Sequence, residues 1–488
     1  MEHTADRLRA ALIDAEYTVD AVLARIGEAG QRALGRNSTI AADWALGRDV
    51  DPLATLTRLW LLQQPVARAV VDRALPGLID ELVAAGILST DATTVAAAVD
   101  VRPYAADDGT AGWVVSDLVN GLDALPVPPR ADYVLGISPA STSLAQLTIR
   151  EPVGSALDLG AGCGVQSLHL TRHAQRVVAT DLNPRANELA GWTFRLSGVA
   201  PKQRLGSLYE PVAGERFDLI VTNPPYVMSP PGPDRLVYRE GSMAADGLVE
   251  AIVRGAADHL NPGGALQVLG NWAILDPDRW EERLAAWIPA GCDALIMERE
   301  RLDPFEYIEI WLADAGLVGQ PEHVRRYREW LDYFDDLGVA GIGMGWLQVH
   351  RSGAAVPDIR IEQWPHAVEQ PVGPAFAAQR DAVGYARRSD AEILATNWRL
   401  ASDIVQETLG DPGAADPRHI VLRSQRGFRR AVEVDTALGG VLGACDGELP
   451  LGAIVSAVAG LLDADPEALV ADLLPRIRHL LADGMLTR

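Results

Sequence analysis

The sequence predicts an α/β protein with a central, mostly parallel sheet and mainly helical regions before and after it. In the middle of the chain, short apolar runs alternate with helix-length amphipathic segments, which is typical of a parallel sheet covered on both faces. Before residue 100 and after residue 435, apolar residues recur at three- and four-residue steps, as in amphipathic helices. The apolar runs are 156–159, 177–179, 217–221, 265–269 and 294–297.

The 488 residues are enough for several domains, and we expect three. They are an N-terminal domain (1–125), the sheet domain (130–355) and a C-terminal domain (375–488), with linkers at the proline-bearing stretches 126–129 and 356–374. In the first domain, helices precede β-like stretches at 93–101 and 112–118, joined by a turn at Asp107-Asp108-Gly109, and this order suggests a winged-helix-like module. The C-terminal domain echoes it with helical patterns at 435–445, 451–462 and 467–481. An ordinary succession of helices that end in glycine explains the echo equally well.

Charge and composition exclude several classes of protein. The 43 basic and 66 acidic side chains give a net charge of −23, so phosphate backbones and anionic membranes repel the chain unless it has a local basic patch. No apolar run reaches the ~18 residues of a membrane span, and the first residues lack the features of a signal peptide. The three cysteines are too far apart for a CxxC metal site or a disulfide framework. We therefore expect a cytoplasmic protein without a membrane partner or a metal.

A glycine-rich turn follows the first apolar run. Asp158 precedes Gly160, Gly162 and Gly164, and glycines let the backbone turn with positive φ and approach a ligand closely. The next run ends at Asp181, where a carboxylate can accept both hydroxyl hydrogens of a ribose. A nucleoside-bearing cofactor is therefore expected. Because Asp158 would repel a pyrophosphate, S-adenosylmethionine, which carries an ammonium group and no phosphate, fits better than NAD.

Both carboxylates also have structural interpretations. Asp158 can cap the glycine turn, and Asp181 can act as a helix N-cap ahead of Asn183-Pro184. The two structural roles together, at this spacing, explain the pattern less well than a cofactor site does.

A second motif, Asn223-Pro224-Pro225-Tyr226, follows the run 217–221 at the end of a predicted strand, where open α/β sheets bind ligands. The Asn223 side-chain oxygen and a proline carbonyl can accept both hydrogens of one –NH2 group and so orient its lone pair. The Tyr226 ring can stack on a planar substrate. This pattern suits methylation of a planar nitrogen, and the alternative is a loop stiffened by two prolines.

These motifs make residues from about 132 to 351 resemble class I S-adenosylmethionine-dependent methyltransferases of the Asn-Pro-Pro-Tyr group. That group contains release-factor glutamine N5-methyltransferases and enzymes that methylate exocyclic amines of adenine or guanine. The resemblance implies a Rossmann-like sheet of seven strands, with the last strand, 342–350, antiparallel. It also implies these site residues: Gly160, Gly162 and Gly164 around the methionine moiety, Asp158, Asp181 and Asn223 on the cofactor, Asn223 and Pro224 on the acceptor nitrogen with Tyr226 as a third catalytic residue, and Pro225 and Tyr226 against the substrate.

Three features depart from that group or extend it. Glutamine methyltransferases carry an acid after the third strand, whereas this chain has Ser207, which can still contact the cofactor but without charge. The aromatic-rich stretch 299–336 is longer than a minimal core needs, and it either covers the acceptor pocket or is an ordinary packed insertion. The hydroxyl-rich stretch 137–143 offers either substrate contacts or helix caps.

Two further clusters were considered as sites. His169 and His173 have a spacing that can bind metal, but no third ligand accompanies them, so two surface histidines are the favoured interpretation. Five arginines precede the C-terminal helices with no acid between Asp416 and Glu433, and they form either a strip that contacts RNA or DNA or ion pairs within the protein. The strip consists of Arg418, Arg423, Arg426, Arg429 and Arg430.

The sequence as a whole predicts an S-adenosylmethionine-dependent N-methyltransferase that acts on a planar nitrogen. Net charge favours a protein glutamine amide or a small molecule as acceptor, and the arginine strip favours the alternative, an exocyclic amine of RNA or DNA. A non-catalytic scaffold that keeps the methyltransferase fold is the second alternative, and the intact motifs argue against it.

Overall fold

The structure, a computed structural model, describes residues 2–124, 130–232, 239–241, 243–412 and 417–488, so the predicted linker at 126–129 lies outside the described residues. Contacts divide the chain into two compact units, Met1–Ala145 with Glu151–Trp364, and Gln146–Arg150 with Pro365–Arg488. Each unit is described by itself. Among the helices of the described residues, none combines the length and apolarity that a membrane crossing needs.

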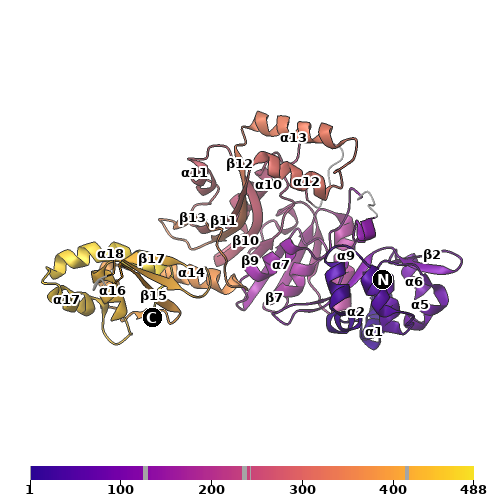
Figure 1. Cartoon of the computed structure of the whole chain (residues 1–488), viewed down its shortest axis with the longest axis horizontal. Coiled ribbons are helices and arrows are strands. Elements are labelled where there is room, and N and C mark those ends of the chain that lie inside the picture. The colour runs from indigo at the N-terminus through magenta and orange to yellow at the C-terminus, as the bar shows by residue number, and fades with distance from the viewer. Residues whose placement is uncertain (1, 125–129, 233–238, 242, 413–416) are drawn as a thin grey trace. The chain divides into compact units, whose positions relative to one another are not determined.

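The first unit is built on a mixed sheet of eight strands, visible at the centre of Figure 1. Its order is β13-β11-β12-β10-β9-β6-β7-β8, and β12 runs antiparallel to both β10 and β11 while the other neighbours are parallel. The seven expected strands, β6 to β12, are therefore present, with the last of them antiparallel, and β13 is an eighth. The strands are β6 (Val153–Leu159), β7 (Ala174–Asp181), β8 (Lys202–Leu205), β9 (Phe217–Thr222), β10 (Leu260–Ile274), β11 (Asp293–Leu302), β12 (Gly341–His350) and β13 (Ile359–Gln363).

Strand β13 corrects the predicted linker at 356–374. Its residues 359–363 pair in parallel with β11, and the boundary between the two units falls directly after them, at Trp364. The short stretch has prolines on both sides, which in the sequence are typical of a linker. An edge strand tolerates such neighbours because only one side of it pairs.

Helices cover both faces of the sheet. Along β6, Leu157 and Leu159 pack in one apolar core, while Asp158 points the other way and meets Ser167 of α8. Helices α10 (Gly247–His259) and α11 (Trp280–Ala285) pack on the Leu157 side. The opposite core contains α8 (Val165–Leu170) and α9 (Pro184–Ser197). Helix α7 (Pro139–Leu147) precedes β6.

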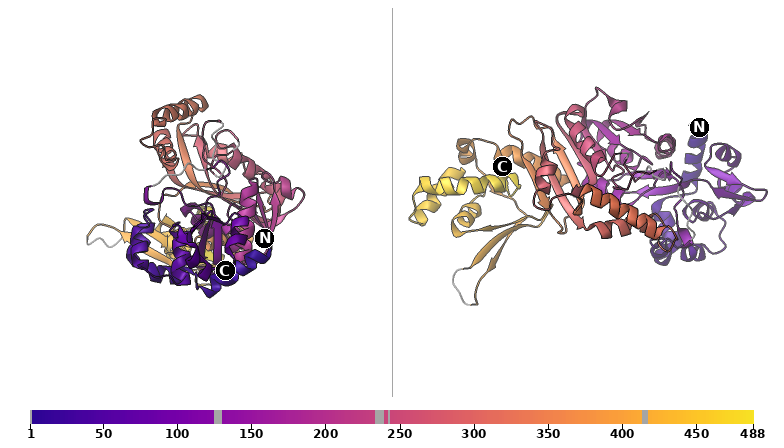
Figure 2. Two further views of the ribbon diagram at one scale, coloured as in Figure 1. Left: turned by 90° about the vertical axis from the view of Figure 1, so that its right-hand side faces the viewer. Right: turned by 90° about the horizontal axis from the view of Figure 1, so that it is seen from above.

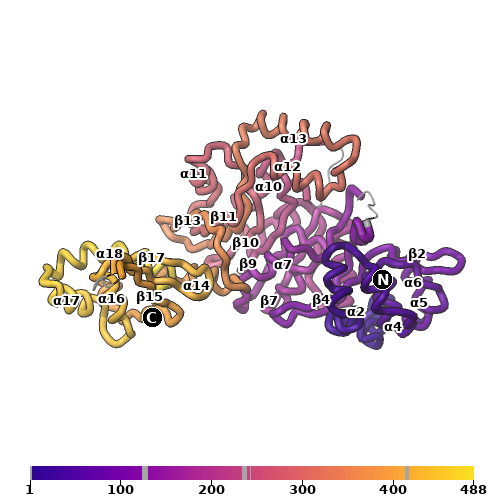
Figure 3. The backbone as a smooth tube through the Cα atoms, in the orientation of Figure 1, coloured from indigo at the N-terminus to yellow at the C-terminus, as the bar shows by residue number. Residues whose placement is uncertain are grey.

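The N-terminal region shares a hydrophobic core with the sheet domain. The core cluster runs from α1 through β5 to α9, and the Val115 backbone N–H donates to the Thr193 side chain of α9 at 2.9 Å. This continuous core joins the first two predicted domains, a junction that the three-domain division did not predict. The N-terminal helices, indigo to violet in Figures 1 and 3, are α1 (Glu2–Asp14), α2 (Val19–Leu34), α3 (Ile40–Leu46), α4 (Pro52–Leu56), α5 (Arg68–Ala74) and α6 (Ile79–Ala84).

Two small sheets complete that region. A three-stranded sheet has the order β1-β3-β2, with α5 and α6 between β1 and β2, and β4 pairs with β5 in a separate hairpin. The predicted single strand at 93–101 is wrong, because β3 and β4 are two strands of different sheets. The strands are β1 (Val66–Ala67), β2 (Leu88–Thr90), β3 (Thr94–Ala97), β4 (Asp100–Ala105) and β5 (Ala111–Ser116).

The predicted insertion at 299–336 is a helical pair at the carboxyl edge of the sheet. Helices α12 (Pro304–Asp314) and α13 (His323–Leu337) connect the end of β11 to the start of the antiparallel β12. Tyr307, Trp330 and Phe334 form their core together with Val227 from the loop after β9. The insertion is therefore packed onto the Asn-Pro-Pro-Tyr loop.

The second unit contains a sheet that the sequence analysis missed. Strands β15 (Ile404–Leu409), β16 (His419–Ser424) and β17 (Ala431–Val434) are antiparallel and lie before the predicted helices, so "mainly helical" describes only part of this unit. The C-terminal helices, yellow in Figure 2, lie where the periodicity predicts them. The remaining elements are α14 (Gly373–Ala386), α15 (Asp390–Ala395), β14 (Arg399–Leu400), α16 (Thr436–Gly443), α17 (Leu451–Leu461), α18 (Pro466–Ala482) and β18 (Leu486–Thr487).

Candidate active site

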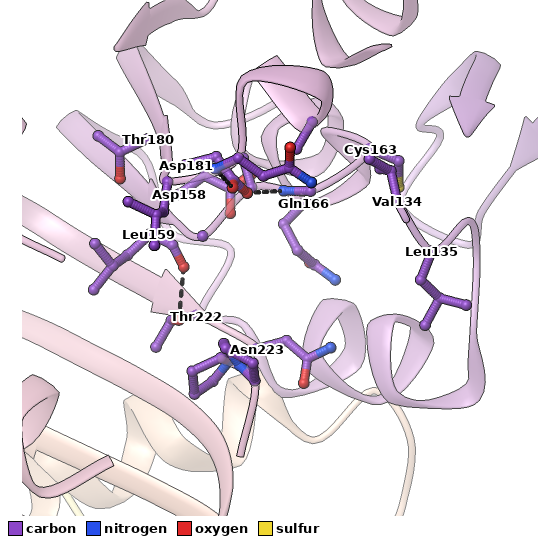
Figure 4. A pocket seen from close by; sticks show the side chains of 18 of the residues that line it. Val134, Leu135, Asp158, Leu159, Cys163, Gln166, Thr180, Asp181, Thr222 and Asn223 are labelled. Carbon is purple, nitrogen blue, oxygen red and sulfur yellow. Dashed lines mark hydrogen bonds between the residues drawn. The ribbon is translucent and has the colours of Figure 1, made fainter. Parts of the chain in front are cut away.

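A cavity of about 290 Å³ lies at the carboxyl ends of β6, β7 and β9. Parallel strands of an open sheet bring their carboxyl ends to one edge, and ligands bind there. The structure thus brings together motifs that are far apart in the sequence (Figure 4). Eight of the predicted site residues line the cavity: Asp158, Gly160, Gly162, Asp181, Ser207, Asn223, Pro224 and Pro225.

The glycine turn leaves space where side chains would stand. Gly160 and Gly162 have φ values of +76° and +54°, which favour glycine, and a Cβ built on either would have no atom within 4 Å. Gly164 differs. A Cβ there would lie 2.6 Å from the Phe194 ring, and Gly164 is not on the cavity wall, so its lack of a side chain serves the packing of α8 on α9.

Asp158 is a buried carboxyl group on the cavity wall. The Ser167 hydroxyl donates to its Oδ2 at 2.6 Å. Burial raises the pKa of Asp158 to about 7, and the Ser167 hydrogen bonds only partly offset that rise. A buried carboxyl with this pKa gains from a cationic partner, because an adjacent positive charge favours its ionised form.

Asp181 lies at the end of β7 and closes the glycine turn. Its Oδ2 accepts from the Gly162 backbone N–H and its Oδ1 from that of Asn183, both at 2.8 Å. The N-cap of α9 is Asn183, whose side chain accepts from the Arg185 N–H, so Asp181 does not hold the N-cap position. Burial raises the pKa of Asp181, although these two backbone hydrogen bonds oppose the rise. Each carboxylate oxygen keeps a second lone pair for a hydroxyl donor.

Asn223 presents an unsatisfied acceptor. Its Oδ1 is buried, and no donor among the described residues lies within hydrogen-bond distance. A buried acceptor without a partner costs about 1–3 kcal/mol, which a ligand donor at this position would recover. The preceding residue is anchored, because the Thr222 hydroxyl donates to the Leu159 carbonyl at 2.6 Å, and this bond is drawn in Figure 4.

The loop after Asn223 is held by the aromatic insertion. The Met228 backbone N–H donates to the Tyr307 hydroxyl at 3.0 Å, and burial raises the pKa of that tyrosine above its ordinary value. Tyr226 is not on the cavity wall. Its ring lies edge-on to that of Trp311, with 6.4 Å between the centroids. The predicted stacking role of Tyr226 is therefore not visible in this arrangement of the loop.

Two wall residues that sequence analysis did not assign to the site, Glu240 and Gln166, stand out. Glu240 is brought to the cavity by pairing of its strand-like segment with Val227, and it accepts from the Ser229 hydroxyl at 2.9 Å. The Gln166 amide nitrogen donates to the Ser141 carbonyl at 2.6 Å. That carbonyl can only accept, so Gln166 Oε1 points away from it, and this buried oxygen has no partner among the described residues. Gln166 stands two residues after Gly164, the last glycine of the turn, and this place in the sequence could have identified it as a site residue.

His169 on α8 and His173 in the turn that follows it are not a surface pair. His169 is 2% exposed, with Nε2 at 2.7 Å from the Tyr104 hydroxyl and Nδ1 at 2.7 Å from Asp108 Oδ2. The prediction of two surface histidines is therefore wrong for His169. Its partners come from the β4–β5 hairpin, which periodicity could not place against α8. Among the described residues, no group of three or more metal-ligating side chains is assembled.

The arginine strip is largely engaged in ion pairs. Arg418 pairs with Asp411, Arg423 donates to Glu407 at 2.8 Å, and Arg430 lies 3.5 Å from Asp483. Three of the five arginines thus have acidic partners within the second unit, as the structural interpretation of the strip expects.

Comparison with known families assigns the central part of the chain. Residues 136–284 match the family model described as Methyltransferase small domain. This segment is a methyltransferase domain. Its cofactor is S-adenosylmethionine, and the buried Asp158 and the open glycine turn at Gly160 and Gly162 fit that cofactor's ammonium group and methionine moiety. Residues 14–98 and 378–488 match two domains of unknown function, DUF7059 and DUF7782.

Curated relatives align with part of the chain. The Ribosomal RNA small subunit methyltransferase C proteins of Escherichia coli strains K12 / DH10B and O157:H7 are 29% identical to the chain over 149 residues. This alignment covers 30% of the chain and 40% of each relative, so the chain spans well under half of their length. The remaining regions have no counterpart in these alignments.

Solved structures show weaker likeness. A 16S rRNA methyltransferase of T. thermophilus, in complex with AdoMet and guanosine, is 21% identical with a TM-score of 0.26, over 38% of this chain and 49% of that one. A ribosomal protein L11 methylase of Lactobacillus delbrueckii is 22% identical with a TM-score of 0.24, over 32% and 69%. TM-scores below 0.5 support no conclusion about this chain.

Proposed function

We propose that the protein is an S-adenosylmethionine-dependent N-methyltransferase whose acceptor is an exocyclic amine of an RNA base. The observation that carries the proposal is the buried, unpartnered Asn223 Oδ1 beside Pro224 on the wall of a cofactor-sized cavity. A planar –NH2 group carries two donors, one for this oxygen and one for a neighbouring carbonyl.

The chemistry needs positioning more than acid or base catalysis. S-adenosylmethionine supplies a methyl group on a sulfonium. Asn223 and Pro224 hold the acceptor nitrogen so that its lone pair faces the methyl carbon. When bound, S-adenosylmethionine would supply the methyl group and keep on its sulfur the electron pair of the bond given up, and the acceptor nitrogen that Asn223 and Pro224 orient would release its proton to water. Alignment of this kind supplies a large part of the rate enhancement in two-substrate reactions.

The choice of acceptor departs from the one that net charge favours. A chain of net charge −23 favours a protein glutamine or a small molecule, but the aligned relatives are named as ribosomal RNA methyltransferases. The family model that matches residues 136–284 spans the glycine turn and the Asn223 motif, the residues that would hold the cofactor and the acceptor. RNA is therefore the acceptor class that the known relatives support.

The test is methyl transfer with three acceptor classes in parallel. Purified full-length protein with radiolabelled S-adenosylmethionine is given unmodified small-subunit ribosomal RNA, a bacterial release factor, or a small-molecule extract. We expect label in RNA only, and nucleoside mass spectrometry should place it on an exocyclic amine. Label on a glutamine amide or on a small molecule would overturn the proposed acceptor, and no transfer in any arm, with intact cofactor binding, would favour a scaffold.

A further inference from the structure

The stretch of chain that carries Asn223 is held at its two ends. It starts at the carboxyl end of β9, which pairs with β6 and β10 in the central sheet. Pro224 and Pro225 have no N–H, so neither of them can anchor the stretch by donating a backbone hydrogen bond. The position of Asn223 therefore depends on how the far end of the stretch, at Met228, is held.

Tyr307 of α12 holds that far end. Its hydroxyl accepts from the Met228 backbone N–H at 3.0 Å and from Asn271 Nδ2 at 2.7 Å. Asn271 lies on β10, and both Asn271 and Tyr307 are fully buried. One hydroxyl thus ties the loop to the central sheet. Without it, the buried Met228 N–H would lose its acceptor, which is costly where water cannot replace the bond.

Helix α12 also fixes the residue before Met228, through Arg239. The Val227 backbone N–H donates to the Arg239 carbonyl at 2.7 Å. The Arg239 guanidinium in turn donates to Asp314 Oδ2 at 2.7 Å and to the Trp311 carbonyl at 3.2 Å, and both acceptors belong to α12. Two successive backbone N–H groups of the loop therefore depend on the same helix.

Helix α13 makes a similar contact to a second wall of the cavity. The Tyr333 hydroxyl accepts from the Ala245 backbone N–H at 2.9 Å. Ala245 lies two residues before α10, whose Leu248 and Ile252 line the cavity. A phenylalanine would fill the same apolar core as either tyrosine, so packing alone does not explain why each hydroxyl accepts from a backbone N–H next to the site.

We propose that Tyr307 is a positioning residue for methyl transfer, which acts through the Met228 backbone to hold Asn223 and Pro224 where they orient the acceptor nitrogen. This proposal rests on the proposed methyl transfer, but not on which acceptor is used. Tyr307 is not on the cavity wall, so it acts through the loop and not by contact with the reactants. A displacement of about 1 Å in a group that orients a reactant can slow a reaction about 100-fold, even when its cause lies away from the reacting atoms.

Amide hydrogen exchange of the full-length protein tests the anchor. In Tyr307→Phe the Met228 N–H has no acceptor, so peptides that cover 223–229 should exchange roughly fivefold faster, as expected for the loss of one hydrogen bond. Peptides that cover the glycine turn at 158–164 should keep the wild-type rate. Unchanged exchange over 223–229 would overturn the proposal. Equal acceleration in both regions would also overturn it, because Tyr307 would then serve only the stability of the fold.

Methyl-transfer kinetics test what the anchor does. We expect Tyr307→Phe to lower kcat roughly 10- to 100-fold. The KM and the calorimetric Kd for S-adenosylmethionine should stay within about twofold, because the hydroxyl contacts the loop and not the cofactor side of the cavity. Tyr327→Phe is the matched control. It removes a hydroxyl of the same insertion that donates to Glu309 at 3.1 Å on the surface, and it should leave kcat unchanged.

A double substitution separates positioning from a merely structural role. In the Asn223→Ala background, Tyr307→Phe should lose most of its effect on kcat, because a residue that acts through Asn223 has nothing left to position. If the two losses multiply in full, Tyr307 acts independently of Asn223 and the proposal is wrong.

A second variant covers the case in which Tyr307→Phe does not fold. Asp314 is half-exposed, so Asp314→Asn weakens the Arg239 anchor without opening the core, and it should lower kcat about two- to fivefold. An unchanged kcat in that variant would then overturn the proposal. Methyl transfer that ignores Tyr307→Phe would refute only the positioning role, whereas no transfer to any acceptor by the wild-type protein would refute the proposed function itself.

Discussion

The two sides of the cavity differ in how far the protein satisfies their polar groups. On the side formed by β6 and β7, both oxygens of Asp181 accept backbone hydrogen bonds, and Asp158 accepts one from Ser167. On the side that follows β9, Asn223 Oδ1 is buried with no partner in the described residues. A satisfied wall keeps its shape before any ligand arrives, whereas an unsatisfied one gains its missing partner from the ligand. The difference suggests that the first side binds the cofactor and the second holds the acceptor.

Asn223→Ala should give the largest difference between its effect on the methyl-transfer rate and its effect on cofactor affinity. We expect the rate of methyl transfer to fall at least about 100-fold, as when a single preorganised polar group is removed from other active sites. The dissociation constant for S-adenosylmethionine should stay within about twofold, because Asn223 Oδ1 is assigned to the acceptor. Single-turnover rates and calorimetry measure the two quantities, and Asn397→Ala, which removes an exposed amide in the second unit, is the matched control. Equal losses of rate and cofactor affinity would contradict the division into two sides.

Asp181→Ala should have the opposite effect. Removing a carboxylate that receives hydrogen bonds from two backbone groups and from a ribose should weaken cofactor binding roughly 10- to 100-fold. It should also lower the thermal unfolding midpoint, because the Gly162 and Asn183 N–H groups lose their acceptor. The rate at saturating cofactor should change far less. Asp20→Ala, at an exposed position in the first turn of α2, controls for the loss of charge alone. A large loss of the methyl-transfer rate at saturating cofactor would show that Asp181 acts in the methyl-transfer step and not in cofactor binding.

Asp158 should make cofactor affinity depend on pH. Its pKa in the free protein is about 7 because it is buried, and a bound ammonium group would lower that pKa. Binding therefore requires loss of the proton below pH 7, so affinity should be full above that pH and fall by up to about tenfold per unit as the pH drops further. Calorimetric titrations with S-adenosylmethionine between pH 5.5 and 8 measure this dependence. The Asp158→Asn variant should bind the cofactor more weakly, and its affinity should not change with pH below pH 7. A flat profile in the wild-type protein would remove Asp158 from the ammonium site.

Sequence analysis could predict those site residues whose positions depend only on neighbouring residues in the chain. The glycine turn, Asp181 and Asn223 each end a strand, so the rule that parallel strands share one carboxyl edge was enough to bring them together. The positions of Tyr226 and His169 depend on residues from other parts of the chain, namely Trp311 and the β4–β5 hairpin. No pattern of periodicity contains such contacts.

The fold shows the same limit. Long apolar runs predicted the central strands, because strands buried on both faces are apolar throughout. Strand β13 and the sheet β15–β17 were missed, since their residues are mostly half-buried or exposed and lack such runs. Their pairing, and not their hydrophobicity, defines them.

The satisfied side has two exceptions among the described residues, Thr180 Oγ1 and Gln166 Oε1, and Gln166 yields the smallest expected effect. Its Oε1 is buried and has no partner among the described residues, whereas its nitrogen is fixed by the Ser141 carbonyl. If the oxygen accepts from the cofactor's ammonium group, Gln166→Leu should weaken S-adenosylmethionine roughly three- to tenfold, as expected for one hydrogen bond. It should leave the affinity for 5′-methylthioadenosine, which lacks the amino acid group, unchanged.

A comparison of the two ligands makes this prediction specific. Equal weakening of both would mean that Gln166→Leu only distorts the glycine turn, because a distorted turn affects every nucleoside ligand. Weakening of S-adenosylmethionine alone would show that an unsatisfied oxygen on this side, Gln166 Oε1, is also completed by a ligand. The two sides of the cavity would then follow one rule: each buried polar atom that the protein leaves without a partner marks a position where a ligand donor binds.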